Sequence, residues 1–178
     1  MARTSLIFVG IIFNFFCCNE PVKITEVSEA DVKVEYPCLS SSSDCLSEID
    51  ILGGTFQMYS SFHIDSVSDV RGAIITTHGN SRNADDYYEK MISVVSSQIS
   101  TDEIMVLAPK FVTNYEKTYD TDWYWNTTSW KWGMQSYNSP HGENVSSFEV
   151  IDSILSKLSN KQFFRQLSDV IITGHSSG

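Results

Sequence analysis

The stretch Asp169-Val170-Ile171-Ile172-Thr173-Gly174-His175-Ser176-Ser177-Gly178 decides how this sequence is interpreted. Four β-branched residues follow the aspartate, a composition that favours a buried strand. The last five residues fit the pattern Gly-x-Ser-x-Gly, which after a strand predicts a turn so sharp that the serine projects from the strand's end. Gly174 and Gly178 suit such a turn because a Cβ at either position would collide with neighbouring backbone.

A second strand-like run lies upstream and also ends in a glycine-containing turn. Arg71 to Thr77 reads RGAIITT and continues into His78-Gly79-Asn80. Strands that alternate with helices predict crossover connections and a mostly parallel sheet, and ligands gather beyond the carboxyl ends of such strands. The pattern therefore predicts an α/β fold in which the turn at His78 and the serine at Ser176 share one edge of the sheet.

Apolar periodicity predicts further elements between these two strands. Thr55 to Ile64 alternates as a strand, and Ile104 to Ala108 is a short buried strand. Ala84 to Ser97 has helical spacing, with Asn83 placed to cap it. Ser146-Ser147-Phe148-Glu149 is a capping box, and the helix that it opens is predicted to bury the face made by Phe148, Ile151, Ile154, Leu155 and Leu158.

The segment from Phe111 to Asn144 is long and irregular, and it holds all four tryptophans of the chain. Two interpretations are open. The tryptophans and tyrosines could line a pocket for an acyl or sugar group above the active edge of the sheet. They could also pack on one another and cover the sheet.

The composition is that of a globular protein with a strong negative charge. The 178 residues hold 22 acidic and 12 basic side chains, which gives a formal net charge of -10 and a pI near 4.7. Nucleic acid and strongly anionic membrane surfaces would repel such a chain, so neither is predicted as a partner. The length allows one domain with a hydrophobic core.

The first residues carry the pattern of an export signal. Arg3 and the amino terminus are positive, and Leu6 to Phe16 is an apolar run too short to span a bilayer comfortably. The predicted divisions are a signal at residues 1–18, a polar arm at 19–52 and a folded domain at 53–178. We expect a secreted or periplasmic protein, with membrane contact only if Cys17 or Cys18 carries a lipid anchor. An uncleaved N-terminal tail is the alternative.

Cys38 and Cys45 flank a serine-rich segment. In an exported protein they are candidates for a disulfide, and two free thiols are the alternative. The chain has no Cys-x-x-Cys pair and no histidine placed to complete a metal site, so no metal is predicted.

Ser176 is the residue on which a catalytic interpretation rests. A serine hydroxyl is a weak nucleophile until a histidine accepts its proton and an acid orients that histidine. The oxyanion that then forms needs amide donors, which we assign to the backbone N–H groups of Asn80 and Ser177, with Gly79 or Ser81 as the alternative to Asn80. His78 and Gly79 are assigned to the support of this oxyanion loop. The alternative is a Gly/Ser-rich turn without chemistry.

With both turns located, the chain resembles the α/β-hydrolase superfamily, and more narrowly its exported serine esterase or lipase-like members. This resemblance implies hydrolysis of an ester or related acyl bond, a small-molecule or acyl substrate, and no metal or organic cofactor. The stretches that carry it are Ile74 to Tyr88, Leu107 to Phe111, Trp130 to Gly133, Ser146 to Val150 and Gly174 to Gly178.

The resemblance also implies the order serine, acid, histidine along the chain, so both partners of Ser176 are expected after residue 178. We therefore expect an incomplete α/β-hydrolase fold whose C-terminal half is missing, whose last strand is an open edge, and which hydrolyses nothing measurable by itself. Two alternatives use the same scaffold: a non-catalytic binding protein and an acyltransferase. The substrate, the bond type and the oligomeric state are left open.

Overall fold

The computed structural model describes residues 37–138, 142–176 and 178. The predicted signal at residues 1–18, the first half of the polar arm and the amide of Ser177 lie outside the described residues. Within the described part of the chain, no helix is long and apolar enough to cross a membrane.

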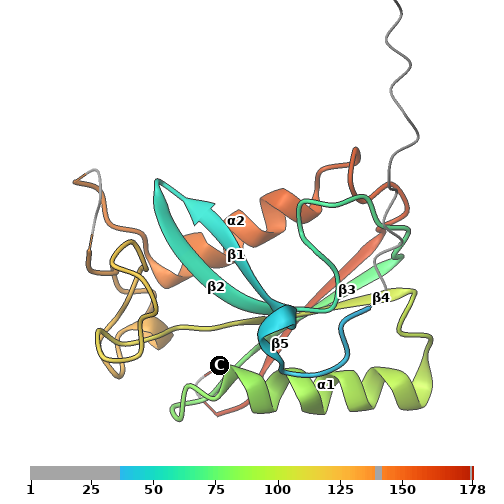
Figure 1. Ribbon diagram of the computed structural model, residues 1–178, viewed down its shortest axis with the longest axis horizontal. Helices are drawn as coiled ribbons and strands as arrows, with labels where there is room; N and C mark the ends of the chain where they lie inside the picture. The colour runs from blue at the N-terminus through green and yellow to red at the C-terminus, as the bar shows by residue number, and fades with distance from the viewer. Residues whose placement is uncertain (1–36, 139–141, 177) are drawn as a thin grey trace, which may run out of the picture. The chain divides into compact units, whose positions relative to one another are not determined.

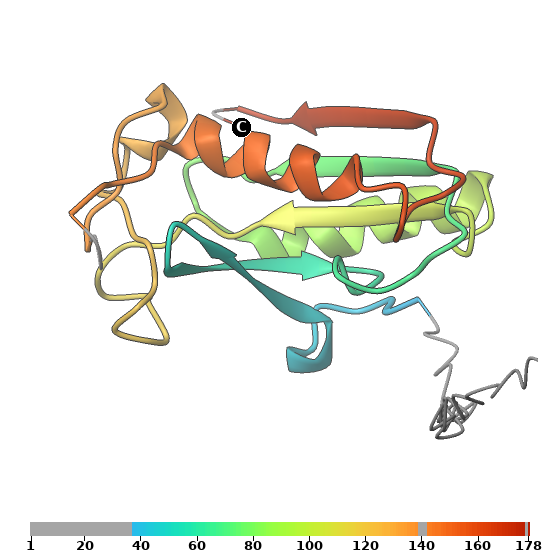
Figure 2. The same ribbon diagram turned by 90° about the horizontal axis from the view of Figure 1, so that it is seen from above.

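A mixed five-stranded sheet lies at the centre of the fold, in the order β1-β2-β4-β3-β5 (Figure 2). β3 pairs in parallel with both β4 and β5, whereas β2 pairs antiparallel with both β1 and β4. The prediction of a mostly parallel sheet is therefore wrong for the β1–β2 side. The strands are β1 (Leu46–Ile51), β2 (Gly54–Ser60), β3 (Gly72–Thr77), β4 (Ile104–Pro109) and β5 (Asp169–Gly174).

β1 was not predicted, because it lies within residues assigned to the polar arm. It is joined to β2 by Leu52 and Gly53, which have φ values of 52° and 79°. Two left-handed residues in succession form the short turn that connects antiparallel strands. This hairpin places Ile49 and Ile51 in the core, so the arm contributes a strand of the sheet.

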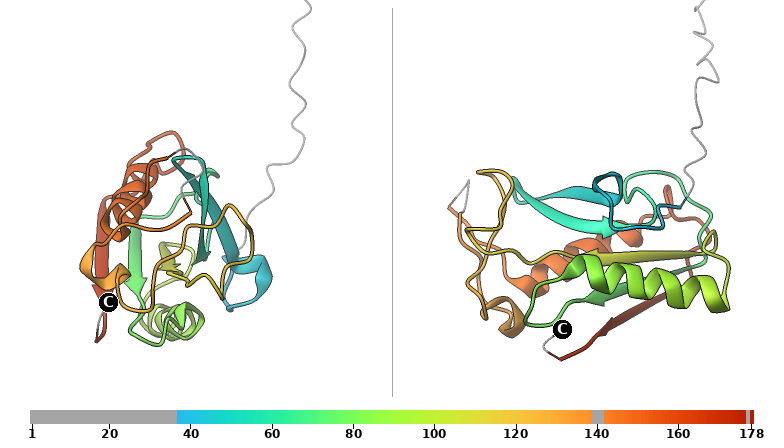
Figure 3. Two further views of the ribbon diagram at one scale, coloured as in Figure 1. Left: turned by 90° about the vertical axis from the view of Figure 1, so that its left-hand side faces the viewer. Right: turned by 60° about the horizontal axis from the view of Figure 1, so that its bottom comes forward.

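Two helices cover opposite faces of the sheet (Figures 1 and 3). Side chains alternate along β4, so that Met105 and Leu107 pack in the cluster that contains α2 (Ser147–Leu158), while Val106 and Ala108 pack in the cluster that contains α1 (Ala84–Gln98). The buried side chains of α1 are Ala84, Tyr88, Ile92 and Val95, and those of α2 are Ser147, Val150, Ile154 and Leu158.

The helix starts agree with the sequence predictions in part. The capping box at Ser146 and Glu149 is confirmed, with each side chain accepting a hydrogen bond from the other residue's backbone N–H. Asn83 occupies the N-cap position of α1 but makes no capping hydrogen bond. Its side-chain amide instead donates to Asp86 Oδ2 at 2.6 Å. Phe148 was assigned to the buried face of α2, but 62% of it is exposed.

The predicted strand at 55–64 is shorter in the structure, where β2 ends at Ser60. Ser60 Oγ donates to the carbonyl oxygen of Phe62, and Ser61 N–H donates to the carbonyl oxygen of Val106. The second bond extends the pairing with β4 by one position beyond the end of β2. Phe62 and Ile64 are nevertheless buried, as their alternation with Phe56 and Met58 predicts.

Cys38 and Cys45 form a disulfide, and Cys45 ends the short helix η1 (Ser43–Cys45). The loop that it closes lies against α1, where Tyr88 Oη donates to the carbonyl oxygen of Cys38 at 2.5 Å. Ser41 Oγ donates to Glu89 Oε1, also at 2.5 Å. The disulfide therefore holds the described start of the chain against this helix.

The irregular segment after β4 packs mostly into the core. Trp123 and Trp125 are buried, and their indole N–H groups donate to the carbonyl oxygens of Ile51 and Met134 at 2.8 and 2.9 Å. Trp130 is also buried, at the start of the short helix η2 (Trp130–Trp132), whereas 70% of Trp132 is exposed. Three of the four tryptophans are thus buried in the core.

β5 forms as predicted, but its side chains are not buried. It is an edge strand, and Val170, Ile171 and Ile172 are exposed, Ile171 to 57%. The residue types predicted a strand correctly, while the place of that strand at the edge of the sheet determines its exposure.

Candidate active site

The turn after β5 holds Ser176 in an unusual backbone conformation. Its φ is 67°, in the left-handed region that residues with a side chain rarely adopt. The neighbouring carbonyl of His175 accepts hydrogen bonds from Gly178 N–H at 3.3 Å and from Tyr87 Oη at 3.4 Å. Such strain at a single serine is typical of a functional turn between a strand and the following segment.

The two glycines of this turn are required by close backbone contacts. A Cβ on Gly174 would lie 2.4 Å from the carbonyl carbon of Gly178. A Cβ on Gly178 would lie 2.3 Å from the carbonyl oxygen of Thr77 and 2.8 Å from that of His78. The turn at 174–178, called the elbow below, therefore packs directly on the end of β3.

The structure brings Ser176 and the turn after β3 together. A Cβ on Gly79 would lie 3.4 Å from Ser176 Cβ and 3.2 Å from the carbonyl oxygen of His175. β3 and β5 are adjacent parallel strands in register from Gly72 and Asp169 onward. Their carboxyl ends therefore meet at one edge of the sheet, and the two turns are in contact there.

His78 is fully buried and connects two segments of backbone. Its Nδ1 lies 2.9 Å from the carbonyl oxygen of Gly79, and its Nε2 accepts a hydrogen bond from Phe111 N–H at 3.1 Å. The second bond requires an unprotonated Nε2, so Nδ1 carries the proton and donates to Gly79. Burial lowers the pKa of His78 to about 4. With both nitrogens occupied, His78 supports the loop and cannot accept a proton from Ser176.

The lowered pKa of His78 predicts a loss of stability in mild acid. The unfolded chain binds this proton near pH 6.5 and the folded chain only near pH 4, so stability is fully present above pH 6.5 and declines as the pH falls. We expect the free energy of unfolding to fall by about 3 kcal/mol between these values. Urea unfolding at several pH values measures this free energy. The variant His78→Gln should lack the part of its pH dependence that comes from His78. Equal pH dependence in both proteins would contradict the assignment.

The peptide between Gly79 and Asn80 is held in a fixed orientation. The carbonyl oxygen of Gly79 accepts hydrogen bonds from His78 Nδ1 and from Arg82 N–H, the latter at 3.0 Å. In a trans peptide the N–H of Asn80 points away from that carbonyl. Among the described residues this N–H has no hydrogen-bond partner, so it remains available to a bound oxyanion.

An ion pair that the sequence analysis did not predict fixes the far end of this loop. Arg82 has a φ of 53° and donates from Nε and Nη2 to the two carboxylate oxygens of Glu116, at 3.0 and 2.8 Å. The hydrogen bond from Arg82 lowers the pKa of Glu116 to about 2. Thr113 also donates to Glu116 from its N–H and hydroxyl. The pair thus joins the loops that follow β3 and β4.

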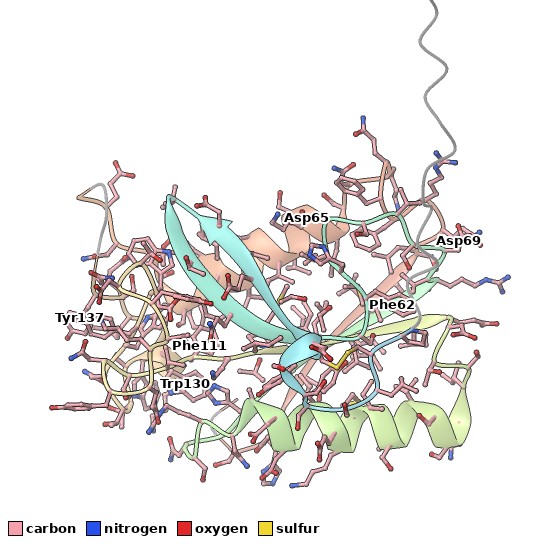
Figure 4. The ribbon with its side chains drawn as sticks, in the orientation of Figure 1. Phe62, Asp65, Asp69, Phe111, Trp130 and Tyr137 are labelled. Carbon is pink, nitrogen blue, oxygen red and sulfur yellow. A yellow bond between two sulfur atoms is a disulfide. The ribbon has the colours of Figure 1, made fainter. Side chains whose placement is uncertain are left out.

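A cavity of about 460 Å³ adjoins the elbow. It lies between α2, the η2 turn and the carboxyl ends of β3 and β5. Figure 4 shows two of its residues, Phe111 and Trp130, close together at this end of the sheet, with ring centroids 5.2 Å apart. Its walls are mainly apolar and comprise Thr77, Phe111, Trp130, Lys131, Ser147, Phe148, Ile151, Asp152, Leu155, Ile172 and Gly178.

Within the described residues, no other histidine side chain forms a hydrogen bond with Ser176. His63 is exposed, and its Nδ1 accepts a hydrogen bond from Asp65 N–H. His175 is exposed beside Ser176, and His141 lies outside the described residues. In the described ranges, no three His, Cys, Asp or Glu side chains gather as ligands for a metal ion.

Comparisons with known proteins give little further information on identity. No protein-family model matches this chain, and no curated protein matches it. Among solved structures, it is similar to poly(aspartic acid) hydrolase-1 from Sphingomonas sp. KT-1, with a TM-score of 0.48 and 17% identity, over 75% of this chain and 47% of that chain. The chain thus spans about half the length of that hydrolase. What the structure establishes is an α/β fold with a mixed sheet of five strands and one helix on each face.

Proposed function

We propose that this chain carries the nucleophile and both oxyanion donors of a serine hydrolase with an α/β-hydrolase type of site. The observation that carries the proposal is the contact between two turns. Ser176, in a left-handed conformation after β5, lies beside Gly79 in the turn that follows the adjacent strand β3. A strained serine beside a glycine turn with a free N–H matches the nucleophile elbow and oxyanion loop of an α/β-hydrolase site.

In the proposed reaction, Ser176 Oγ attacks the carbonyl carbon of an ester or related acyl group. The serine proton passes to a histidine base, and the carbonyl oxygen becomes an oxyanion that accepts hydrogen bonds from the N–H groups of Asn80 and Ser177. The base then protonates the leaving alcohol, and water hydrolyses the acyl-enzyme by the reverse sequence. In the chain order of the α/β-hydrolase superfamily, the acid and the histidine base follow the nucleophile.

The cavity next to the elbow supports a pocket for part of the substrate. Phe148, Ile151 and Leu155 of α2 line it together with Ile172 of β5, and Gly178 forms part of its wall. Apolar side chains exposed in such a cavity favour the binding of an apolar group. We propose that this group is attached to the acyl carbon that Ser176 attacks.

The disulfide supports the export that residues 1–18 suggest. Disulfides form and persist in oxidising compartments, and they are rare in the cytosol. The bond between Cys38 and Cys45 is therefore consistent with a secreted or periplasmic hydrolase.

A fluorophosphonate probe tests the proposal, because it forms a covalent bond only with an activated serine. The protein is expressed from its complete reading frame, including any residues that follow Gly178. Mass spectrometry of the digested adduct should place the label on Ser176. A label on another serine would overturn the assignment. Absence of a label together with retained ligand binding would favour the non-catalytic binding protein.

A further inference from the structure

We propose that the cavity beside the elbow takes a substrate with a carboxylate group near the scissile bond, and that Lys131 binds this carboxylate. The inference rests on the proposed function, since it names the substrate class of the same site.

Lys131 is a half-buried cation at the cavity without an ionic partner. Its Nζ donates to Asn80 Oδ1 at 3.1 Å and lies 5.4 Å from the centre of the Trp132 ring. Within the described part of the chain, no carboxylate lies within 4.0 Å of this nitrogen. By contrast, Arg82 in the neighbouring loop is paired with Glu116. Lys131 therefore places a positive charge without an ionic partner beside the proposed oxyanion donor, Asn80.

The turn that carries Lys131 is held rigidly. Trp130 stacks on Phe111 with an interplanar angle of 11°, and its carbonyl oxygen accepts a hydrogen bond from Ser147 Oγ at the start of α2. On the other side of Lys131, Gly133 has a φ of 70° and packs so closely on Phe148 that a Cβ would lie 2.4 Å from the ring. The backbone at Lys131 is thus fixed, and the hydrogen bond to Asn80 Oδ1 holds its ammonium group, which lowers the entropic cost of binding an anion.

The residues that line the cavity favour a ligand with one negative charge and an apolar body. An ammonium group has three donors, and Asn80 occupies one, so two remain for a carboxylate. Asp152, the other charged residue at the cavity, is exposed on α2 and forms no ion pair with Lys131 in the described residues. A single lysine suits one negative charge, whereas a phosphate dianion is typically bound by several donors or a fork of arginine.

Equilibrium binding of two matched ligands tests the proposal without catalysis. 4-Phenylbutyrate and the neutral 4-phenylbutan-1-ol share an apolar body and differ in the carboxylate. Titration followed by tryptophan fluorescence should show about 2- to 5-fold tighter binding of the carboxylate at low salt, a preference that weakens as salt is added. Equal affinities for the two ligands would overturn the inference.

Two variants identify the residue responsible. Lys131→Met removes the charge and the hydrogen bond, whereas Lys131→Gln removes the charge but keeps a donor for Asn80. Both variants should bind the carboxylate and the alcohol with about equal affinity. Lys90→Met removes an equal charge from the exposed face of α1 and should leave the preference intact. A preference that persists in both Lys131 variants would contradict the assignment.

The outcomes separate this inference from the proposed function. If the fluorophosphonate labels Ser176 but the wild-type protein shows no preference for the carboxylate, the hydrolase proposal stands and the inference fails. If Ser176 is not labelled but the Lys131-dependent preference is present, the cavity is an anion-binding site and the hydrolase proposal fails.

Discussion

Replacing Ser176 with alanine is expected to lower the rate of fluorophosphonate labelling and of ester hydrolysis by at least about 10⁴-fold. The reason is chemical, because the variant lacks the oxygen that forms the acyl-enzyme. The measurement uses the protein expressed from its complete reading frame, with rates compared at equal concentrations of folded protein. Activity within 100-fold of the wild-type rate would show that another group is the nucleophile.

The variant Ser176→Gly separates the chemistry from the backbone strain. Ser176 has a φ of 67°, which glycine adopts without the steric cost that a Cβ brings. We expect the glycine variant to be as inactive as the alanine variant but more stable by roughly 1 kcal/mol, measured by urea unfolding. A glycine variant less stable than the alanine variant would contradict the strained conformation of the elbow.

Replacing Gly178 with alanine is expected to reduce the labelling of Ser176 by about 100-fold. The reason is that the added Cβ displaces the elbow relative to the oxyanion loop, and a displacement of about 1 Å is enough for a loss of this size. The added Cβ would lie 2.3 Å from the carbonyl oxygen of Thr77, which is backbone at the end of β3 and cannot rotate away. The elbow must therefore move. The overpacking should also cost about 1–3 kcal/mol of stability.

Gly72→Ala is the matched control for this prediction. Gly72 also lies in β3, and its added Cβ would approach Ile104 Cδ1 to 2.8 Å. That atom is the end of a flexible side chain, so a change of rotamer can relieve the contact. We expect unchanged labelling in this variant. Equal losses in both variants would mean that the effect is general and does not come from the contact between elbow and β3.

The elements that local sequence specifies were predicted well. The capping box at Ser146 and Glu149 forms because both partners lie within one helical turn. The strands at β3 and β4 follow from short runs of apolar residues. β1 was missed because the serine-rich stretch before it and the Leu52-Gly53 turn obscured a short alternation. Ile49 and Ile51, two residues apart before a Gly-Gly pair, are the signal that could have revealed the hairpin.

The sequence by itself determined that a strand ends at a serine between two glycines, because strand and turn preferences act over a few neighbouring residues. Only the tertiary structure decided what this serine meets. The pairing of β5 with β3 places Gly79 beside Ser176. Lys131 contacts Asn80 across 51 residues of chain. Such contacts depend on the order of strands and on the packing of loops at one end of the sheet, and no short sequence pattern encodes either.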